Sequence, residues 1–197
     1  MHLVLVRHGE TEENVKCISQ GHTHGTLTER GYEQIRAAAA MLQTREFDAA
    51  YTSDLRRCTE TARIIGEANP SLTFITTDRI REKNQGAFQG LAHKDIPWHT
   101  LPGTWFTRRP ENGESLEDLY NRAQKFLTEL RATHAGKKVI LVTHGGFIRV
   151  IRAIAENKTE DELSEILKST PVTNASISEI FFHPDGIAKV LTWNRTL

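Results

Sequence analysis

Short apolar runs alternate along the chain with longer segments in which apolar residues recur every three or four positions. Four of the runs are too short for helices and are typical of buried strands. Between residues 176 and 193, two apolar segments flank the turn sequence HPDG at 183–186, which predicts a β-hairpin. The four single strands are predicted at Leu3–Val6, Asp48–Thr52, Thr73–Thr77 and Val139–Thr143.

Helices are predicted between several of these strands. Thr28 is placed to cap a helix over 29–44, and Asp54 to start one over 55–68. Ser115 and Asp118 form a capping-box pattern ahead of an apolar stripe that reaches residue 130. Further helices are predicted at 145–155 and at 159–168. Strands that alternate with helices in this way predict an α/β fold with a mostly parallel sheet.

The periodic pattern fails between Gly86 and Gly113, where prolines and aromatic residues are scattered among polar ones. A loop of this length within a domain is typical of a lid or a binding insertion. We therefore predict a single domain over residues 1–197 with a lid or insertion around 86–113. Its aromatic residues either cover a ligand pocket or pack the insertion onto the core: Trp98, Trp105 and Phe106.

Composition excludes several classes of partner. The 197 residues carry 25 basic and 25 acidic side chains, so the formal net charge of zero gives no support for binding to nucleic acid or a membrane surface. Two cysteines, Cys17 and Cys58, do not make a disulfide framework or a cysteine-based zinc site. The chain shows neither a leader nor a membrane-spanning pattern, so a cytoplasmic protein is expected. The sequence does not decide between a monomer and a homodimer.

Basic and imidazole side chains follow three of the predicted strands. Arg7-His8-Gly9 follows the first strand, TSDLRR at 52–57 follows the second, and THGG at 143–146 follows the fourth. Because the carboxyl ends of parallel strands meet at one edge of the sheet, these groups are expected to lie together. The helix that begins after His144 adds main-chain N–H groups and the positive end of its dipole. This edge is predicted to bind a dianion such as phosphate.

The same motifs, taken in order, resemble those of the histidine phosphatase superfamily, which has the phosphoglycerate mutase-like fold. They are LVRHGETEEN, TSDLRRCTETA, GAFQG, GES and VTHGGFIRVI, and the resemblance runs from Leu3 to the C-terminus. The resemblance implies a three-layer α/β sandwich in which helices flank a mostly parallel central sheet.

The resemblance also implies a mechanism. His8 would be the nucleophile that forms a phosphohistidine, so neither a metal nor a cofactor is implied. Arg7 and Arg57 would hold the phosphoryl oxygens, because a guanidinium fork matches their geometry. The spacing from Ser53 selects Arg57 and leaves its neighbour on the surface. His144 and the N–H of Gly145 would donate to the same phosphoryl group.

Further positions follow from the same resemblance. Glu82 matches the family carboxylate that acts first as acid and then as base. Asn14 would add a phosphate contact, and the pair Gln20-Gly21 would contact the substrate. Residues alone leave three other carboxylates as alternatives for the acid: Glu29, Glu33 and Glu114. His22 and His24 make a poor metal pair without further ligands, so a substrate contact or a plain loop is favoured.

Three functions are compatible with these features. The first is a metal-independent, acid-type phosphomonoesterase that acts on a small phosphorylated metabolite. The second is a 2,3-bisphosphoglycerate-dependent phosphoglycerate mutase: Gln89 in GAFQG resembles the mutases, whereas Gln85 and His93 stand where those enzymes carry a tyrosine and a lysine. The third is a non-catalytic module that binds phosphorylated ligands.

Overall fold

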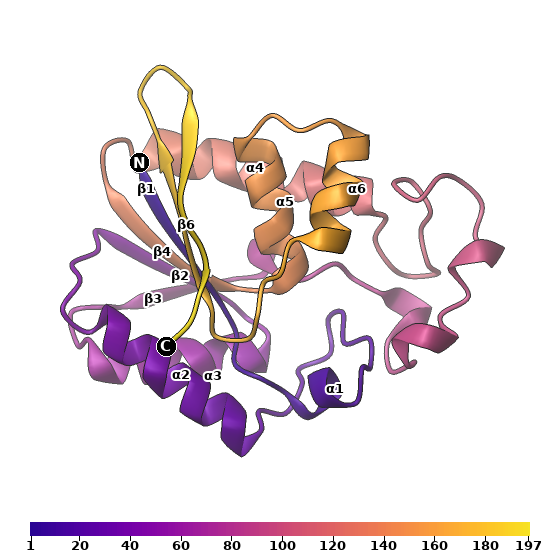
Figure 1. Ribbon diagram of the computed structural model, residues 1–197, viewed down its shortest axis with the longest axis horizontal. Helices are drawn as coiled ribbons and strands as arrows, with labels where there is room; N and C mark the ends of the chain where they lie inside the picture. The colour runs from indigo at the N-terminus through magenta and orange to yellow at the C-terminus, as the bar shows by residue number, and fades with distance from the viewer.

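A six-stranded sheet forms the centre of the protein, described here by a computed structural model of residues 1–197 (Figure 1). The strand order is β3-β2-β4-β1-β5-β6. The first four strands in this order run parallel, and β5 and β6 add an antiparallel edge. The strands are β1 (His2–Arg7), β2 (Ala49–Ser53), β3 (Phe74–Thr77), β4 (Lys138–Thr143), β5 (Ile177–Phe182) and β6 (Ala188–Arg195).

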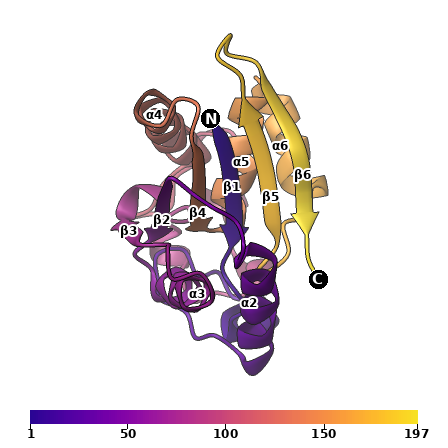
Figure 2. The same cartoon turned by 90° about the vertical axis from the view of Figure 1, so that its left-hand side faces the viewer.

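Helices cover both faces of this sheet, as Figure 2 shows. Because successive side chains of a strand point to opposite faces, Val4 and Val6 of β1 pack with α2 and α3, whereas Leu3 and Leu5 pack with α4, α5 and α6. The central strands are buried on both sides, which explains their continuous apolar sequence. The helices are α1 (Glu12–Val15), α2 (Glu29–Leu42), α3 (Arg56–Ala68), α4 (Leu116–Thr133), α5 (Gly145–Ala155) and α6 (Glu160–Ser169).

The predicted α/β sandwich is confirmed, with the hairpin as its antiparallel edge. Ser115 and Asp118 form the predicted capping box at the start of α4. Thr28 accepts a hydrogen bond from the Gly31 N–H at the start of α2. The prediction that Asp54 starts α3 is wrong, because Leu55 occupies the cap position and makes no side-chain cap. The carboxylate of Asp54 is paired instead with the Arg81 guanidinium, with Nε 2.7 Å from Oδ1.

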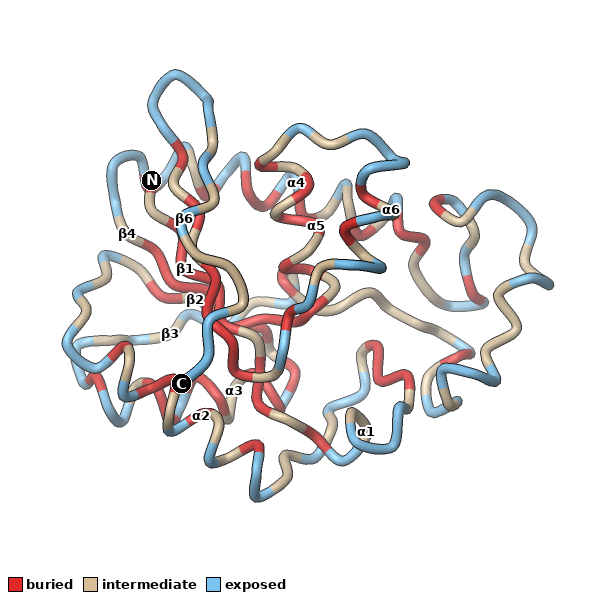
Figure 3. The backbone as a smooth tube through the Cα atoms, viewed as in Figure 1, coloured by how far each residue is buried: buried red, intermediate tan, exposed pale blue.

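Residues 86–113 contain no α-helix or strand, only three short 3₁₀ helices at Gly86–Phe88, His93–Asp95 and Trp98–Thr100. Much of this segment is exposed, as Figure 3 shows. Its first part pairs with the loop after α1 through a bridge between Ile18 and Ala92. Phe106 anchors its far end in the core beside α4. A role for the segment as a lid stays a prediction.

None of the helices combines the length and the apolar composition that crossing a bilayer requires.

Candidate active site

Strand register brings the two predicted site histidines together. In the parallel pair β1–β4, Arg7 lies opposite Thr143, so His8 and His144 are the next residues at the same edge. Their ring centroids are 5.3 Å apart. The turn after His8 is tight, because a Cβ on Gly9 would lie 2.6 Å from Ile35 Cδ1 and 2.8 Å from the Gly31 carbonyl. Only glycine fits against α2 at this point.

His8 is held in one tautomer. Its Nδ1 lies 2.8 Å from the Gly9 carbonyl oxygen, and a carbonyl can only accept, so Nδ1 carries the proton. The Nε2 lone pair is then free, and this atom makes no hydrogen bond to the protein. The ring is 3% exposed. Burial, followed by the charges of Arg57 and Arg7, holds the pKa of His8 well below its usual range. The imidazole is therefore neutral and nucleophilic at physiological pH.

Arg57 lies at the base of the site and is 1% exposed. Its guanidinium donates to the Gly21 carbonyl at 2.9 Å and to the Thr23 carbonyl. Its Nε lies 3.2 Å from His144 Nδ1. The neighbouring Arg56 is exposed, so the choice of Arg57 from the sequence spacing is consistent with burial.

Arg7 contributes an unpaired buried donor. One terminal nitrogen donates to the Val172 carbonyl at 2.6 Å, whereas Nε is buried without a partner. A Cβ added to Gly145 would lie 3.4 Å from this Nε and 3.3 Å from a terminal nitrogen of Arg149, so the two guanidinium groups lie on the same side of Gly145. Burial lowers the pKa of Arg7 to about 10, so it stays charged at neutral pH. An unpaired N–H is costly unless a ligand satisfies it, and phosphate has suitable oxygens.

His144 is fully buried and bonded to the protein by both ring nitrogens. Its Nδ1 faces Arg57, and its Nε2 lies 2.9 Å from Ser53 Oγ and 3.4 Å from Cys58 Sγ. Because the guanidinium can only donate, Nδ1 accepts and Nε2 carries the proton. Burial raises the pKa of the Cys58 thiol to about 12, so this cysteine is an unreactive packing group. A direct role for His144 as phosphate donor stays a prediction.

Glu82 belongs to the loop after β3, and its carboxylate lies at the start of α5 next to Gly146. Its Oε2 accepts from the Gly146 N–H at 2.9 Å, and its Oε1 accepts from the Lys83 N–H at 2.9 Å. A Cβ on Gly146 would lie 3.0 Å from Glu82 Cδ and would overlap Oε1. At the N-terminus of α5, the Arg7 guanidinium therefore lies against Gly145 and the Glu82 carboxylate lies against Gly146.

The loop that carries Glu82 is held by Arg122 of α4. The Arg122 guanidinium donates to the main-chain carbonyls of residues 79, 81 and 82. Two of its nitrogens also lie 2.9 Å from the two carboxylate oxygens of Glu114. Glu114 accepts in addition from the Asn84 N–H, and His22 Nε2 lies 2.9 Å from the Glu82 carbonyl. Glu114 is therefore a structural carboxylate, and His22 supports the loop.

The remaining predicted contacts are near His8 but partly occupied by protein groups. Asn14 Oδ1 accepts from Asn174 at 3.0 Å, and Asn174 also donates to the His8 carbonyl at 3.2 Å. The side-chain nitrogen of Asn14, Nδ2, makes no hydrogen bond to the protein, whereas its main-chain N–H donates to Thr11 Oγ1. Gln20 is buried with an unpaired Oε1, and Gly21 has φ of 51°, which turns its carbonyl toward Arg57. Substrate contacts by these residues stay predictions. The other two alternative acids, Glu29 and Glu33, are exposed on α2.

A hollow of about 510 Å³ opens beside Glu82 and Gly146, and we call it the side pocket. Trp98 and Trp105 of the 86–113 segment form part of its wall, together with leucines of α4 and α6. The aromatic residues of the segment therefore differ: Trp98 and Trp105 line this hollow, whereas Phe106 packs into the core with Trp105 against it. The remaining lining residues are Lys83, Gln85, Arg108, Leu116, Leu119, Arg149 and Leu167.

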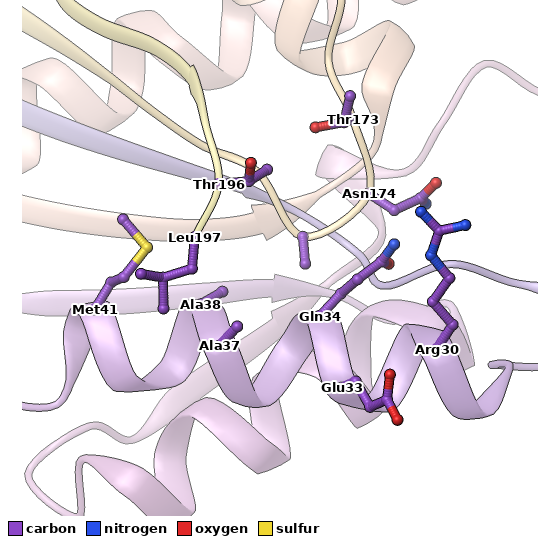
Figure 4. Close-up of a pocket in the computed structure, with 11 residues that line it drawn as sticks. Arg30, Glu33, Gln34, Ala37, Ala38, Met41, Thr173, Asn174, Thr196 and Leu197 are labelled. Carbon is purple, nitrogen blue, oxygen red and sulfur yellow. The ribbon is translucent and has the colours of Figure 1, made fainter.

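A separate hollow of about 460 Å³ lies between α2 and the C-terminal residues (Figure 4). It contains none of the predicted site residues. Asn174 and Ala175 connect it with the site, because both line the hollow and both donate a hydrogen bond to the His8 carbonyl.

Three residues around the site were not predicted as part of it: Lys83, Arg122 and Arg149. Arg149 had an available signal, since it lies four residues after Gly145 and so shares its helix face. Arg122 is a charged residue within the apolar stripe of α4, a position that calls for a buried partner. Lys83 had no signal beyond its place next to Glu82.

Comparison with known proteins places this geometry in a family. Residues 3–196 match the model of the histidine phosphatase superfamily (branch 1). A probable phosphatase of Schizosaccharomyces pombe is 32% identical over 98% of this chain and 92% of its own. A 2,3-bisphosphoglycerate-dependent phosphoglycerate mutase of Bartonella bacilliformis is 33% identical over 86% of this chain and 89% of its own.

Among solved structures, a mycobacterial glucosyl-3-phosphoglycerate phosphatase in complex with VO3 has a TM-score of 0.84 and 31% identity, covering 98% of both chains. The protein belongs to the histidine phosphatase superfamily.

Proposed function

We propose that the protein is a phosphomonoesterase that hydrolyses a small phosphorylated metabolite through a phosphohistidine on His8. The observation that carries the proposal is the tautomer of His8, whose Nδ1–H is bonded to the Gly9 carbonyl while Nε2 is left free. This lone pair lies in a site with the charged side chains of Arg7 and Arg57, and burial together with these charges lowers the pKa of His8. A neutral nucleophile beside fixed cations suits attack on a phosphate dianion.

In the first step, Nε2 attacks phosphorus and the ester P–O bond breaks. Glu82 in its acid form passes its proton to the departing oxygen, and the Gly9 carbonyl stabilises the ring as it gains positive charge. The Nε–H of Arg7, which has no acceptor within the protein, donates a hydrogen bond to a phosphoryl oxygen. Arg57 supplies the second guanidinium, and the N–H of Gly145 at the start of α5 adds a main-chain donor. For His144 to donate as well, its Nε2–H must exchange Ser53 Oγ for a phosphoryl oxygen.

In the second step, water attacks the phosphohistidine. Glu82 takes one proton from this water, the N–P bond breaks, and phosphate is released with His8 restored. Each proton and bond is accounted for by groups of this chain, so the proposal includes no metal and no cofactor.

Phosphate release from an aryl phosphate tests the proposal, measured after exhaustive dialysis against a chelator. We expect turnover without added metal and its loss in His8→Ala, with an unchanged circular dichroism spectrum. His183→Ala, which alters an exposed histidine in the β5–β6 turn, is the matched control and should retain activity. Full turnover by His8→Ala would refute the phosphohistidine mechanism.

The mutase remains the second candidate, because a mutase of Bartonella bacilliformis is 33% identical to this chain. The two activities share the phosphoenzyme and differ in whether water or a second hydroxyl accepts the phosphoryl group. Incubation with 3-phosphoglycerate and 2,3-bisphosphoglycerate separates them. Formation of 2-phosphoglycerate without free phosphate would establish the mutase.

A further inference from the structure

The side pocket lies where the alcohol part of a substrate must go. Glu82 lines this hollow, and in the proposed function Glu82 gives its proton to the oxygen that leaves phosphorus. The group attached to this oxygen therefore extends away from His8 and into the hollow. Its volume of about 510 Å³ lies within the usual range for small-molecule sites. Two tryptophans and three leucines form part of the walls, and this apolar part suits a compact carbon skeleton or ring.

The charges of the side pocket are unbalanced. Three cations line it, Lys83, Arg108 and Arg149, against the single carboxylate of Glu82. This carboxylate already accepts two main-chain hydrogen bonds. None of the three cations is in an ion pair, whereas Arg122 of the neighbouring helix is paired with Glu114. The imbalance is therefore local, in a protein whose formal net charge is zero.

Lys83 lacks a partner although it is partly buried. Its Nζ lies 4.4 Å from the centroid of the Trp98 ring and makes neither a hydrogen bond nor an ion pair. Burial lowers the pKa of Lys83 to about 8, which is the sign of a cation without sufficient compensation. The Trp98 face offers some stabilisation through its quadrupole. An anion from outside the chain would provide the rest.

Arg149 extends this positive charge toward the phosphate site. Its Nε donates to the Thr170 carbonyl at 2.7 Å, and no acidic side chain of the protein pairs with its terminal nitrogens. One of these nitrogens lies on the same side of Gly145 as Arg7 Nε. A ligand that spans from the phosphate site into the side pocket would pass Arg149 before it reaches Lys83.

We infer that the alcohol part of the substrate carries a carboxylate, which Lys83 and Arg149 bind in the side pocket. The inference rests on the proposed phosphatase function. A monoanion is favoured over a second phosphate, because the walls of leucine and tryptophan leave a dianion poorly hydrated. The substrate class is thus a phosphate monoester of a small hydroxy acid.

Two aryl phosphates of matched shape test this inference: 4-carboxyphenyl phosphate and its neutral analogue 4-carbamoylphenyl phosphate. We expect the wild-type kcat/KM to favour the carboxylate at least tenfold at pH 7. Lys83→Met should lower this ratio, because only Arg149 then remains to bind the carboxylate, and Lys83→Arg should retain it. Lys94→Met removes the same charge from an exposed position of the 86–113 segment and should leave the ratio unchanged.

The ratio should also depend on pH. The charged groups that act on Lys83 are Glu82, Glu114, Asp118 and Arg108. With a pKa of about 8, Lys83 loses its proton as the pH rises to 9, so the preference should decline there in the wild type. Lys83→Arg should keep the preference at pH 9, because a guanidinium stays protonated.

The possible results separate the two proposals. If neither aryl phosphate nor phenyl phosphate is hydrolysed, the proposed phosphatase function is wrong. If all three are hydrolysed and the two matched substrates have equal kcat/KM, the phosphatase function stands and the carboxylate inference is overturned. A preference that is undiminished in Lys83→Met would also overturn it.

Discussion

Gly146→Ala is the sharpest perturbation of the proposed acid, because it changes one methyl group beside Glu82. The new Cβ would lie 3.0 Å from Glu82 Cδ and 3.1 Å from Oε2, against an ordinary contact of 3.4 Å or more, and would overlap Oε1. The carboxylate must then retreat by about 1 Å, and a displacement of this size costs about 100-fold in rate when it misplaces a reacting group.

The loss should depend on the leaving group. Phenolate is a poor leaving group and needs a proton, whereas p-nitrophenolate departs without one. We expect kcat/KM for phenyl phosphate to fall about 100-fold in Gly146→Ala, and kcat/KM for p-nitrophenyl phosphate to fall only a few-fold. The ratio kcat/KM is the right measure, since it covers only the steps up to release of the phenol and excludes the attack by water.

Stability provides the control for this variant. Alanine is favoured over glycine in a helix by about 1 kcal/mol, so the melting temperature should not decrease through helix propensity. Gly66→Ala in α3 is the matched substitution, because a Cβ there meets only the Leu72 carbonyl at 3.8 Å. It should leave both substrates unaffected. A loss in Gly146→Ala that is equal for the two phosphates, or smaller than threefold for phenyl phosphate, would refute the acid role of Glu82.

Two further predictions concern the support of the site. Arg122→Lys loses the two-fold contact with Glu114 and the hydrogen bonds to three carbonyls, so it should lower kcat/KM for phenyl phosphate about tenfold and lower it less for p-nitrophenyl phosphate. It should also reduce the free energy of unfolding by about 3 kcal/mol, measured by urea titration. Equal losses of kcat/KM on both phosphates would mean that Arg122 does not position Glu82. The pKa values of His8 and His144 are held well below 6.5 by burial and by Arg57, so the unfolded chain binds protons that the folded chain does not. The free energy of unfolding should therefore fall as the pH drops below 6.5. His8→Asn should make the decrease between pH 7.5 and pH 5 smaller by about 2 kcal/mol, because it removes one histidine that is neutral only in the folded chain. A decrease as large as that of the wild type would show that His8 is charged in the folded protein.

Much of the fold could be predicted from the sequence, because its signals are local. Strands buried on both faces must be short and apolar, and Val139–Thr143 shows this pattern. The capping box of Ser115 and Asp118 acts within one helical turn. Asp54 shows where such reasoning fails: a cap signal was overridden by an ion pair with Arg81, which lies 27 residues away.

The site divides in the same way. The sequence alone determined that Arg7, His8 and His144 follow strands and so meet at one edge, since parallel order requires it. The family resemblance assigned the acid role to Glu82, but only the tertiary structure shows how the surroundings of Glu82 and Glu114 differ. Glu82 and Glu114 are both loop carboxylates, and they differ because Arg122 of α4 pairs with one of them while Gly146 of α5 leaves room for the other.

The side pocket is entirely a product of tertiary structure. Its cations come from the loop after β3, from the 86–113 segment and from α5, and only Arg149, on the helix face of Gly145, has a sequence signal that connects it with the site. Periodicity reports whether a residue faces the core of its own element. Periodicity does not predict which charged side chains lack a partner in the folded chain, because pairing depends on distances between elements that are remote in sequence.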